Sequence, residues 1–183
     1  MSRSLLRGAR LARQRTEEPP TIRSSAPRML AIYLNDHFAG ATSGAALAKR
    51  VARNHHADEF GSRLTAVARE IKRDRTALRQ IMRVLGVRPA RYKIVAAWLA
   101  EKFGRLKPNG GLVRRTRLSA LLELEALCLG VQGKAAGWRT LLAVHDQYPR
   151  LDEQALRGLL ARAHHQFDEL ENMRARTATA LGS

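Results

Sequence analysis

The sequence predicts an all-α protein built as a four-helix bundle, and three observations support this. Apolar residues recur at steps of three and four over four long segments, as on one face of an α-helix. No segment alternates apolar and polar residues over a useful length, so no strand is expected. Each segment is about 25 to 30 residues, or about 40 Å at 1.5 Å per residue, and helices this long bury their apolar faces by packing side by side.

The first two helices are predicted over residues 29–55 and 58–85, as a hairpin that turns near Ala57. Asp58 is the expected N-cap of the second helix, and Gly86 provides its C-terminal stop. Pro89 opens a shorter extra helix over 90–103, and a loop over 104–115 follows it.

The last two helices are predicted over residues 118–147 and from about 153 to 174. Tyr148 and Pro149 break the chain between them, and Asp152 is the expected N-cap of the last helix. The roughly 30 residues between the second and third major helices are the only long connection, and they are long enough to cross the bundle.

The domain organisation predicted is a basic arm over 1–28, one bundle domain over 29–176 and a frayed tail over 177–183. The arm has seven arginines, three prolines and only two acids. Its acid-free first half has the composition of an organellar transit peptide, but a bacterial tail or an over-extended start codon is the interpretation we favour. With no secretory segment, no run of 18 apolar residues and a single cysteine, Cys128, we expect a cytoplasmic protein without a membrane association.

The chain is strongly basic, with a formal net charge of +17. Such a charge attracts nucleic acid, anionic membranes and acidic partners. Only six of the 33 basic residues are lysine, and alanine, leucine and glycine are abundant. This bias is typical of a GC-rich genome, for example that of an actinobacterium, so part of the charge reflects codon usage.

Two polar residues interrupt the apolar faces of the first two helices. His37 falls in the series that includes Leu34 and Ala41, and Asp74 falls between Ile71 and Leu78. In a hairpin that turns near Ala57, His37 and Asp74 lie at about the same height. Because a buried polar group must be paired, we predict that they form a hydrogen-bonded pair that fixes the register of the helices.

The alternative is a metal or small-ligand site, because carboxylates and imidazoles on facing helices of a bundle hold iron or manganese. Glu125 has apolar neighbours on its face of the third helix, so it is expected to be more buried than Glu123 and to need a cation such as Lys134 or Arg69. The candidate ligands are His37, Glu70, Asp74 and Glu125. If His37 and Asp74 form a structural pair, we expect no cofactor. If these residues belong to a metal site, we expect iron or manganese.

The helix lengths, the single long connection and the inward acidic residues resemble the ferritin-like superfamily over residues 29–174. The resemblance implies a di-metal bundle, but the chain has no Glu-x-x-His, the metal motif of that superfamily. More narrowly, the segments LAIYLNDHFAGA, AREIKRDR, RYKIVAAWLAEKFGRLK and LELEALCLGVQGK are similar to a family of uncharacterised actinobacterial helical proteins. That resemblance implies no activity.

Glycines inside the first and third helices predict a close helix crossing, because each costs about 1 kcal/mol relative to alanine. They are Gly40, Gly44, Gly130, Gly133 and Gly137. The loop after the short helix and its flanks form a second candidate site, for a phosphate or a nucleic-acid backbone. Its basic residues are Lys102, Arg105, Lys107, Arg114, Arg115 and Arg117.

The sequence lacks the common enzyme motifs. The segment Gly130 to Ala135 is too short between its glycines for a phosphate-binding loop, and no Gly-x-Ser-x-Gly elbow is present. We therefore predict a non-catalytic bundle that acts through protein contacts or as a homo-oligomer. The alternatives are a metal-binding or redox bundle with nonstandard ligands, and a basic accessory protein that binds nucleic acid through the arm and the loop.

Overall fold

The computed structural model describes residues 26–90 and 117–181. Four long helices make up most of them: α1 (Arg28–Asn54), α2 (Gly61–Val84), α4 (Arg117–Val144) and α5 (Glu153–Thr179), with a 3₁₀ turn, η1 (His145–Gln147), after α4. The described ranges contain no strand. The predicted all-α class and helical bundle are therefore confirmed, while the short helix over 90–103 falls almost wholly outside the described residues.

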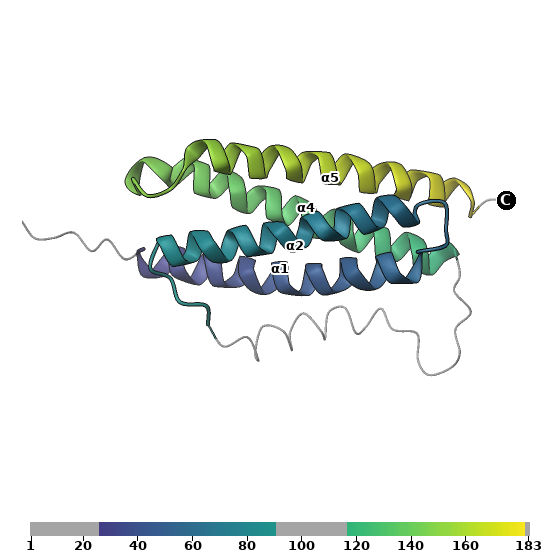
Figure 1. Cartoon of the computed structure of the whole chain (residues 1–183), viewed down its shortest axis with the longest axis horizontal. Coiled ribbons are helices and arrows are strands. Elements are labelled where there is room, and N and C mark those ends of the chain that lie inside the picture. Colours follow the sequence, from purple (N-terminus) through teal and green to yellow (C-terminus); the bar gives the residue numbers. More distant parts are fainter. Residues whose placement is uncertain (1–25, 91–116, 182–183) are drawn as a thin grey trace, which may run out of the picture.

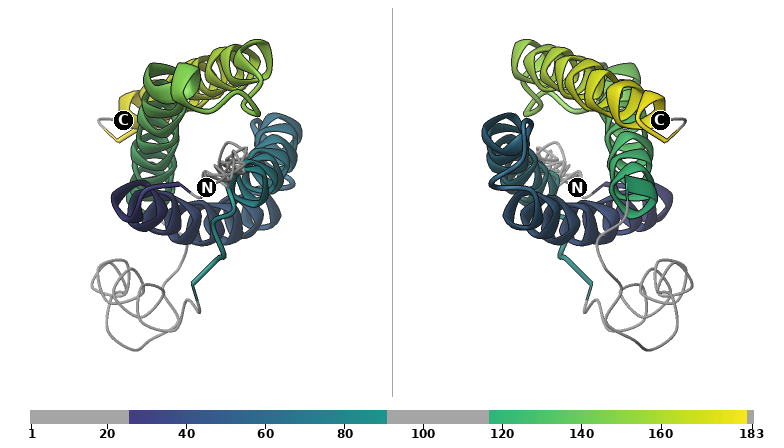
Figure 2. Two further views of the ribbon diagram at one scale, coloured as in Figure 1. Left: turned by 90° about the vertical axis from the view of Figure 1, so that its left-hand side faces the viewer. Right: turned by 90° about the vertical axis from the view of Figure 1, so that its right-hand side faces the viewer.

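The helices lie side by side as two hairpins around a common axis (Figures 1 and 2). α1 and α2 are joined by residues 55–60, and α4 and α5 by residues 145–152. α4 begins at the end of the bundle where α1 turns into α2, so α2 and α4 run in the same direction (Figure 1). The end of α2 and the start of α4 therefore lie at opposite ends of the bundle.

The helix ends test three predicted signals. Gly86 has a φ of 69° and ends α2 as expected: its amide bonds to Arg83 O, and the Val87 amide bonds to Met82 O. Asp152 caps α5, since its Oδ1 accepts from the Ala155 amide at 3.0 Å. The prediction for Asp58 is wrong, because Phe60 is the N-cap of α2 and makes no side-chain cap.

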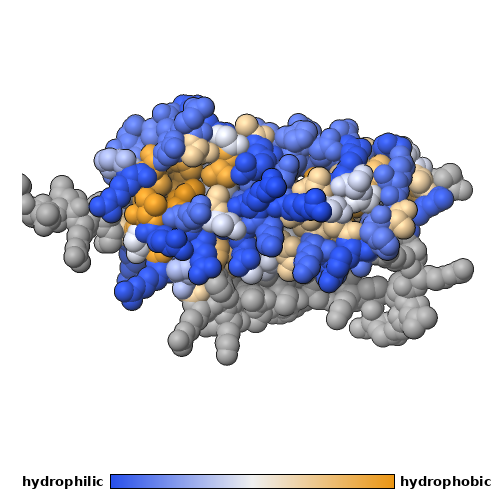
Figure 3. Space-filling model, viewed as in Figure 1, coloured by the Kyte–Doolittle hydropathy of each residue, from blue (hydrophilic) through white to orange (hydrophobic). Residues whose placement is uncertain are grey.

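One apolar core fills the space between the four helices. Its fully buried side chains come from every helix, among them Leu34, Met82, Trp138, Leu156 and Met173. Trp138 is 2% exposed and is the largest of the fully buried side chains. α2 and α5 make the sparsest contacts of the neighbouring helices. Figure 3 shows the side of the bundle on which α2 and α5 lie. Hydrophilic side chains cover much of this side, and an apolar area lies where α2 ends and α5 begins. None of the described helices is long and apolar enough to cross a membrane.

Candidate functional site

The most polar place in the core is the carboxylate of Asp74, which is 1% exposed. Lys134 Nζ of α4 lies 2.6 Å from its Oδ2. Arg162 of α5 donates to its Oδ1 from Nε at 2.8 Å and lies 2.6 Å away through Nη2. Gln166 Nε2 of α5 donates to Oδ2 at 3.1 Å. Asp74 thus joins three helices.

Gln166 extends this contact into a closed network. Its Nε2 also donates to Glu70 Oε2 at 2.9 Å, and its Oε1 accepts from Lys134 Nζ. The network therefore holds two carboxylates and two cations around one amide. We call Glu70, Asp74, Lys134, Arg162 and Gln166 the buried ion network. Such a set fixes the mutual positions of the helices because each group needs its partners.

Lys134 is the cation of the network whose charged form is disfavoured by burial. Burial lowers the pKa of its ammonium, while the neighbouring Asp74 carboxylate acts in the opposite direction. Its amine is held between the Asp74 and Gln166 oxygens, which favour the charged form. The arrangement can therefore hold charges in place, and it presents no carboxylate and nucleophile side by side in an open site.

His37 does not meet Asp74, so the predicted pair is wrong. The His37 ring lies 4.4 Å from the Tyr33 ring, centroid to centroid, and a Cβ on Gly137 of α4 would come within 2.9 Å of its Nδ1. Tyr33 Oη donates to Thr140 Oγ1 at 2.9 Å beside it. His37 thus faces α4, while Asp74 takes its partners from α4 and α5.

The proposed metal ligands are not brought together either. Glu70 and Asp74 share Gln166, but the Glu125 side chain is 44% exposed and lies 4.0 Å from Arg174 Nη1. Glu123 is the more buried of the two, at 22%, and lies 3.2 Å from His55 Nε2, so the predicted order is reversed. Within residues 26–90 and 117–181, no group of three or more His, Cys, Asp or Glu side chains could hold a metal ion.

The glycine prediction is confirmed at one position. Gly137 lets α4 approach the His37 ring of α1, because a Cβ there would clash with it. Cβ atoms built on Gly40, Gly44, Gly130 and Gly133 would meet nothing within 4 Å. A close approach inside the chain therefore explains only Gly137.

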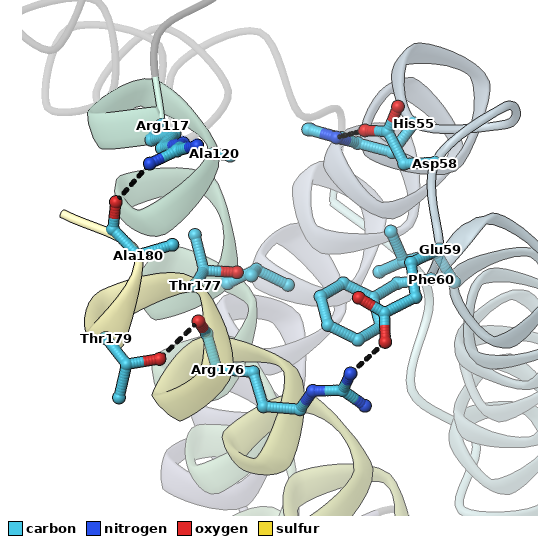
Figure 4. A pocket seen from close by; sticks show the side chains of 12 residues that line it. His55, Asp58, Glu59, Phe60, Arg117, Ala120, Arg176, Thr177, Thr179 and Ala180 are labelled. Carbon is cyan, nitrogen blue, oxygen red and sulfur yellow. Dashed lines mark hydrogen bonds and ion pairs between the residues drawn. The ribbon is translucent and has the colours of Figure 1, made fainter. Parts of the chain in front are cut away.

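An open pocket of about 630 Å³ lies at the end of the bundle where α1 turns into α2 (Figure 4). Its charged side chains are engaged locally. Arg176 pairs with Glu59 and lies over the Phe60 ring, 5.1 Å from its centroid, while Asp58 Oδ2 lies 2.5 Å from His55 Nδ1. Arg117 of the predicted basic loop donates to Ala180 O at 2.6 Å. The other five basic residues of that prediction, at 102, 105, 107, 114 and 115, lie outside the described residues.

Two members of the buried ion network were not expected from the sequence. Gln166 had a detectable signal, since it interrupts the buried series Leu159, Ala163, Leu170 and Met173 of α5 as Asp74 interrupts that of α2. Arg162 had no such signal. Arg157, another arginine of α5, pairs with Glu153 in solvent, so the residue type alone does not indicate which arginine has a buried partner.

His37 makes the stability of the fold depend on pH. Burial lowers its pKa below the ordinary value of 6.5, while Asp36 raises it less. The neutral ring is therefore the folded form, and its contribution is present above pH 6.5 and lost as the pH falls through the lowered pKa. Between pH 7.5 and 5 the wild type should lose more free energy of unfolding than His37→Asn, measured by urea titration. Parallel pH curves would rule this out.

The fold and the network together define the class of protein: a four-helix bundle of two hairpins held by a buried ion network. Beyond that class, no protein-family model, curated protein or solved structure matches this chain. The two resemblances drawn from the sequence therefore gain no support from a match.

Proposed function

We propose that this protein is a non-catalytic, cytoplasmic helical bundle that acts through protein contacts, first of all with a second copy of itself. The finer assignment to the ferritin-like architecture is part of this proposal. It is supported by the parallel α2 and α4 and the single long connection between two hairpins (Figure 1). The protonation of the single cysteine also favours a non-catalytic role. Burial raises the pKa of the Cys128 thiol to about 11, and the reactive form of a cysteine is the thiolate.

The observation that carries the proposal is the outer face of α4. Leu118, Leu122 and Leu129 are 53%, 38% and 75% exposed, and Gly133 and Ala136 continue the same face at helical spacing. We call these five residues the α4 outer face. Between Leu122 and Arg139, the one charged side chain of α4 that is well exposed is Glu125, at 44%, and it lies 4.0 Å from Arg174 Nη1. A helix that is apolar on both faces is typical of one that is covered on both.

A second copy is the occupant that fits this face. Two chains with a net charge of +17 repel one another, so they approach best where the surface has no exposed Lys or Arg, as between Leu122 and Arg139. The face also complements itself: Leu129 projects one turn from Gly133, above which there is open space. An antiparallel pair about a two-fold axis lets each Leu129 pack on the Gly133 of the other copy. This contact would offset the helical cost of the glycine.

Sedimentation equilibrium over a concentration series tests the proposal. We expect the wild type to form a dimer, and Leu129→Glu to raise its dissociation constant at least tenfold, because the substitution buries an unpaired charge at the centre of the contact. Val84→Glu is the matched control, since Val84 is a 42% exposed apolar residue on α2. It should leave the dimer intact.

Two results would contradict the proposal. One is a monomeric wild type at all concentrations up to hundreds of micromolar. The other is a dimer that Leu129→Glu and Val84→Glu weaken equally. Circular dichroism confirms that each variant keeps its helices, so a loss of the dimer is not mistaken for unfolding.

A further inference from the structure

The exposed face of α2 is a continuous basic surface. Five exposed basic residues lie on it at steps of three, one, six and four, namely Arg69, Lys72, Arg73, Arg79 and Arg83. The polar, uncharged Thr76 and Gln80 fill the positions between them. These spacings put all five on one side of the helix, centred on Thr76. We call them the α2 basic face.

No acidic side chain neutralises this face from its own helix. The two acids of α2, Glu70 and Asp74, are both bound to Gln166 in the buried ion network. Among the described residues, none of the five basic side chains makes an ion pair. The inward placement of the acids thus leaves the outward charge uncompensated.

Codon usage alone does not explain the concentration of charge on α2. α2 has seven Lys and Arg among 24 residues, whereas α4, from the same chain, has three among 28. A uniform compositional bias would raise the charge of both helices alike. The basic residues are therefore denser on α2 than on α4, and five of the seven on α2 lie on its exposed side.

The chemistry of the face favours the phosphates of a nucleic-acid duplex. Four of the five side chains are arginines, whose guanidinium forks match phosphate oxygens. No aromatic side chain lies on the face, so stacking with the bases of a single strand is not offered. A membrane-surface helix would need an apolar side toward the lipid, and the apolar side of α2 is buried in the bundle.

The dimensions agree with this ligand. From Arg69 to Arg83 the face is about 21 Å long at 1.5 Å per residue. Measured along the axis of a duplex, that length corresponds to about six phosphates of one strand at 3.4 Å each. We propose that the α2 basic face binds the phosphate backbone of double-stranded nucleic acid without sequence specificity. This inference does not depend on the α4 outer face, which lies on a different helix.

Fluorescence anisotropy of the full chain with a labelled 25-base-pair DNA duplex over a salt series tests this proposal. The test variant replaces Lys72, Arg73 and Arg79 by glutamine. The matched control replaces Lys49, Arg53 and Arg139 by glutamine. These three residues are also exposed, and their replacement removes the same charge from α1 and α4. Because each lost phosphate contact releases about 0.9 fewer counterions, the slope of log K against log salt should fall by about 3 in the test variant.

At 0.1 M salt this change corresponds to a loss of affinity of roughly 100-fold or more in the test variant. The control should lose less than about tenfold, through the long-range field alone. An RNA duplex, a single strand and anionic vesicles serve as competing probes. Binding of the RNA duplex as well as the DNA supports backbone recognition. Equal losses in the two variants, no duplex binding at 50 mM salt, or tighter binding to vesicles or to the single strand would each overturn the proposal.

Discussion

Asp74→Ala should lower the free energy of unfolding by about 3–5 kcal/mol, the cost of breaking a buried ion pair by removing one partner. The substitution leaves Lys134 Nζ and Arg162 without the carboxylate that lies 2.6 Å from each. The Lys134 side chain is only 13% exposed, so its unpaired charge must be desolvated. Arg162 is 36% exposed and turns partly to water, which keeps the loss toward the lower end. Urea unfolding followed by circular dichroism measures the change.

Two further variants separate charge from packing at this site. Asp74→Asn keeps the shape but removes the charge, so it should cost nearly as much as Asp74→Ala. The double variant Asp74→Leu/Lys134→Met removes both charges and should recover much of the loss, because apolar groups of similar size often replace a buried pair at no cost. A change below about 1 kcal/mol for Asp74→Ala would show that the network contributes little.

Gly137→Val should lower the free energy of unfolding by about 1–3 kcal/mol, as overpacking does in a filled site. A Cβ at this position would lie 2.9 Å from His37 Nδ1 and 3.1 Å from Cε1, so the ring must shift from its present position beside Tyr33. Gly158→Val is the matched control on α5, where a Cβ meets nothing within 4 Å. It should change stability by less than about 0.5 kcal/mol.

A second substitution identifies the cause of the Gly137→Val effect. His37→Ala removes the ring that a side chain at position 137 would meet, so the double variant should lose less than the sum of the two single losses. Strict additivity in this double-mutant cycle would mean that the cost of Gly137→Val arises elsewhere.

The sequence predicted the helices well because their signals are local. Gly86 ended α2, and Asp152 capped α5, since each acts through backbone groups a few residues away. Asp58 failed as a cap because its carboxylate bonds to His55 across the turn. That choice depends on the shape of the turn, which helical periodicity does not specify.

The polar contacts between helices were harder to predict. The periodicity correctly placed Asp74 in the core, but it does not state which neighbouring helix supplies the partner. His37 and Asp74 were matched by height within one hairpin, whereas the partners of Asp74 lie more than 50 residues further along the chain. Gln166 is a polar residue within the apolar face of α5, and it contacts Asp74 of α2. The polar residues that interrupt the apolar faces of all four helices must therefore be compared together, not pair by pair.

The arrangement of the two hairpins has a consequence for how the chain folds. Each hairpin joins neighbours in the sequence through a short turn, so its contacts form with little loss of loop entropy. The buried ion network, in contrast, links α2 of one hairpin to α4 and α5 of the other. We therefore expect these charges to lose their water only when the two hairpins dock. Hairpins docked in a wrong register would leave the charges buried without partners. The network thus favours the native register at the step in which the hairpins dock.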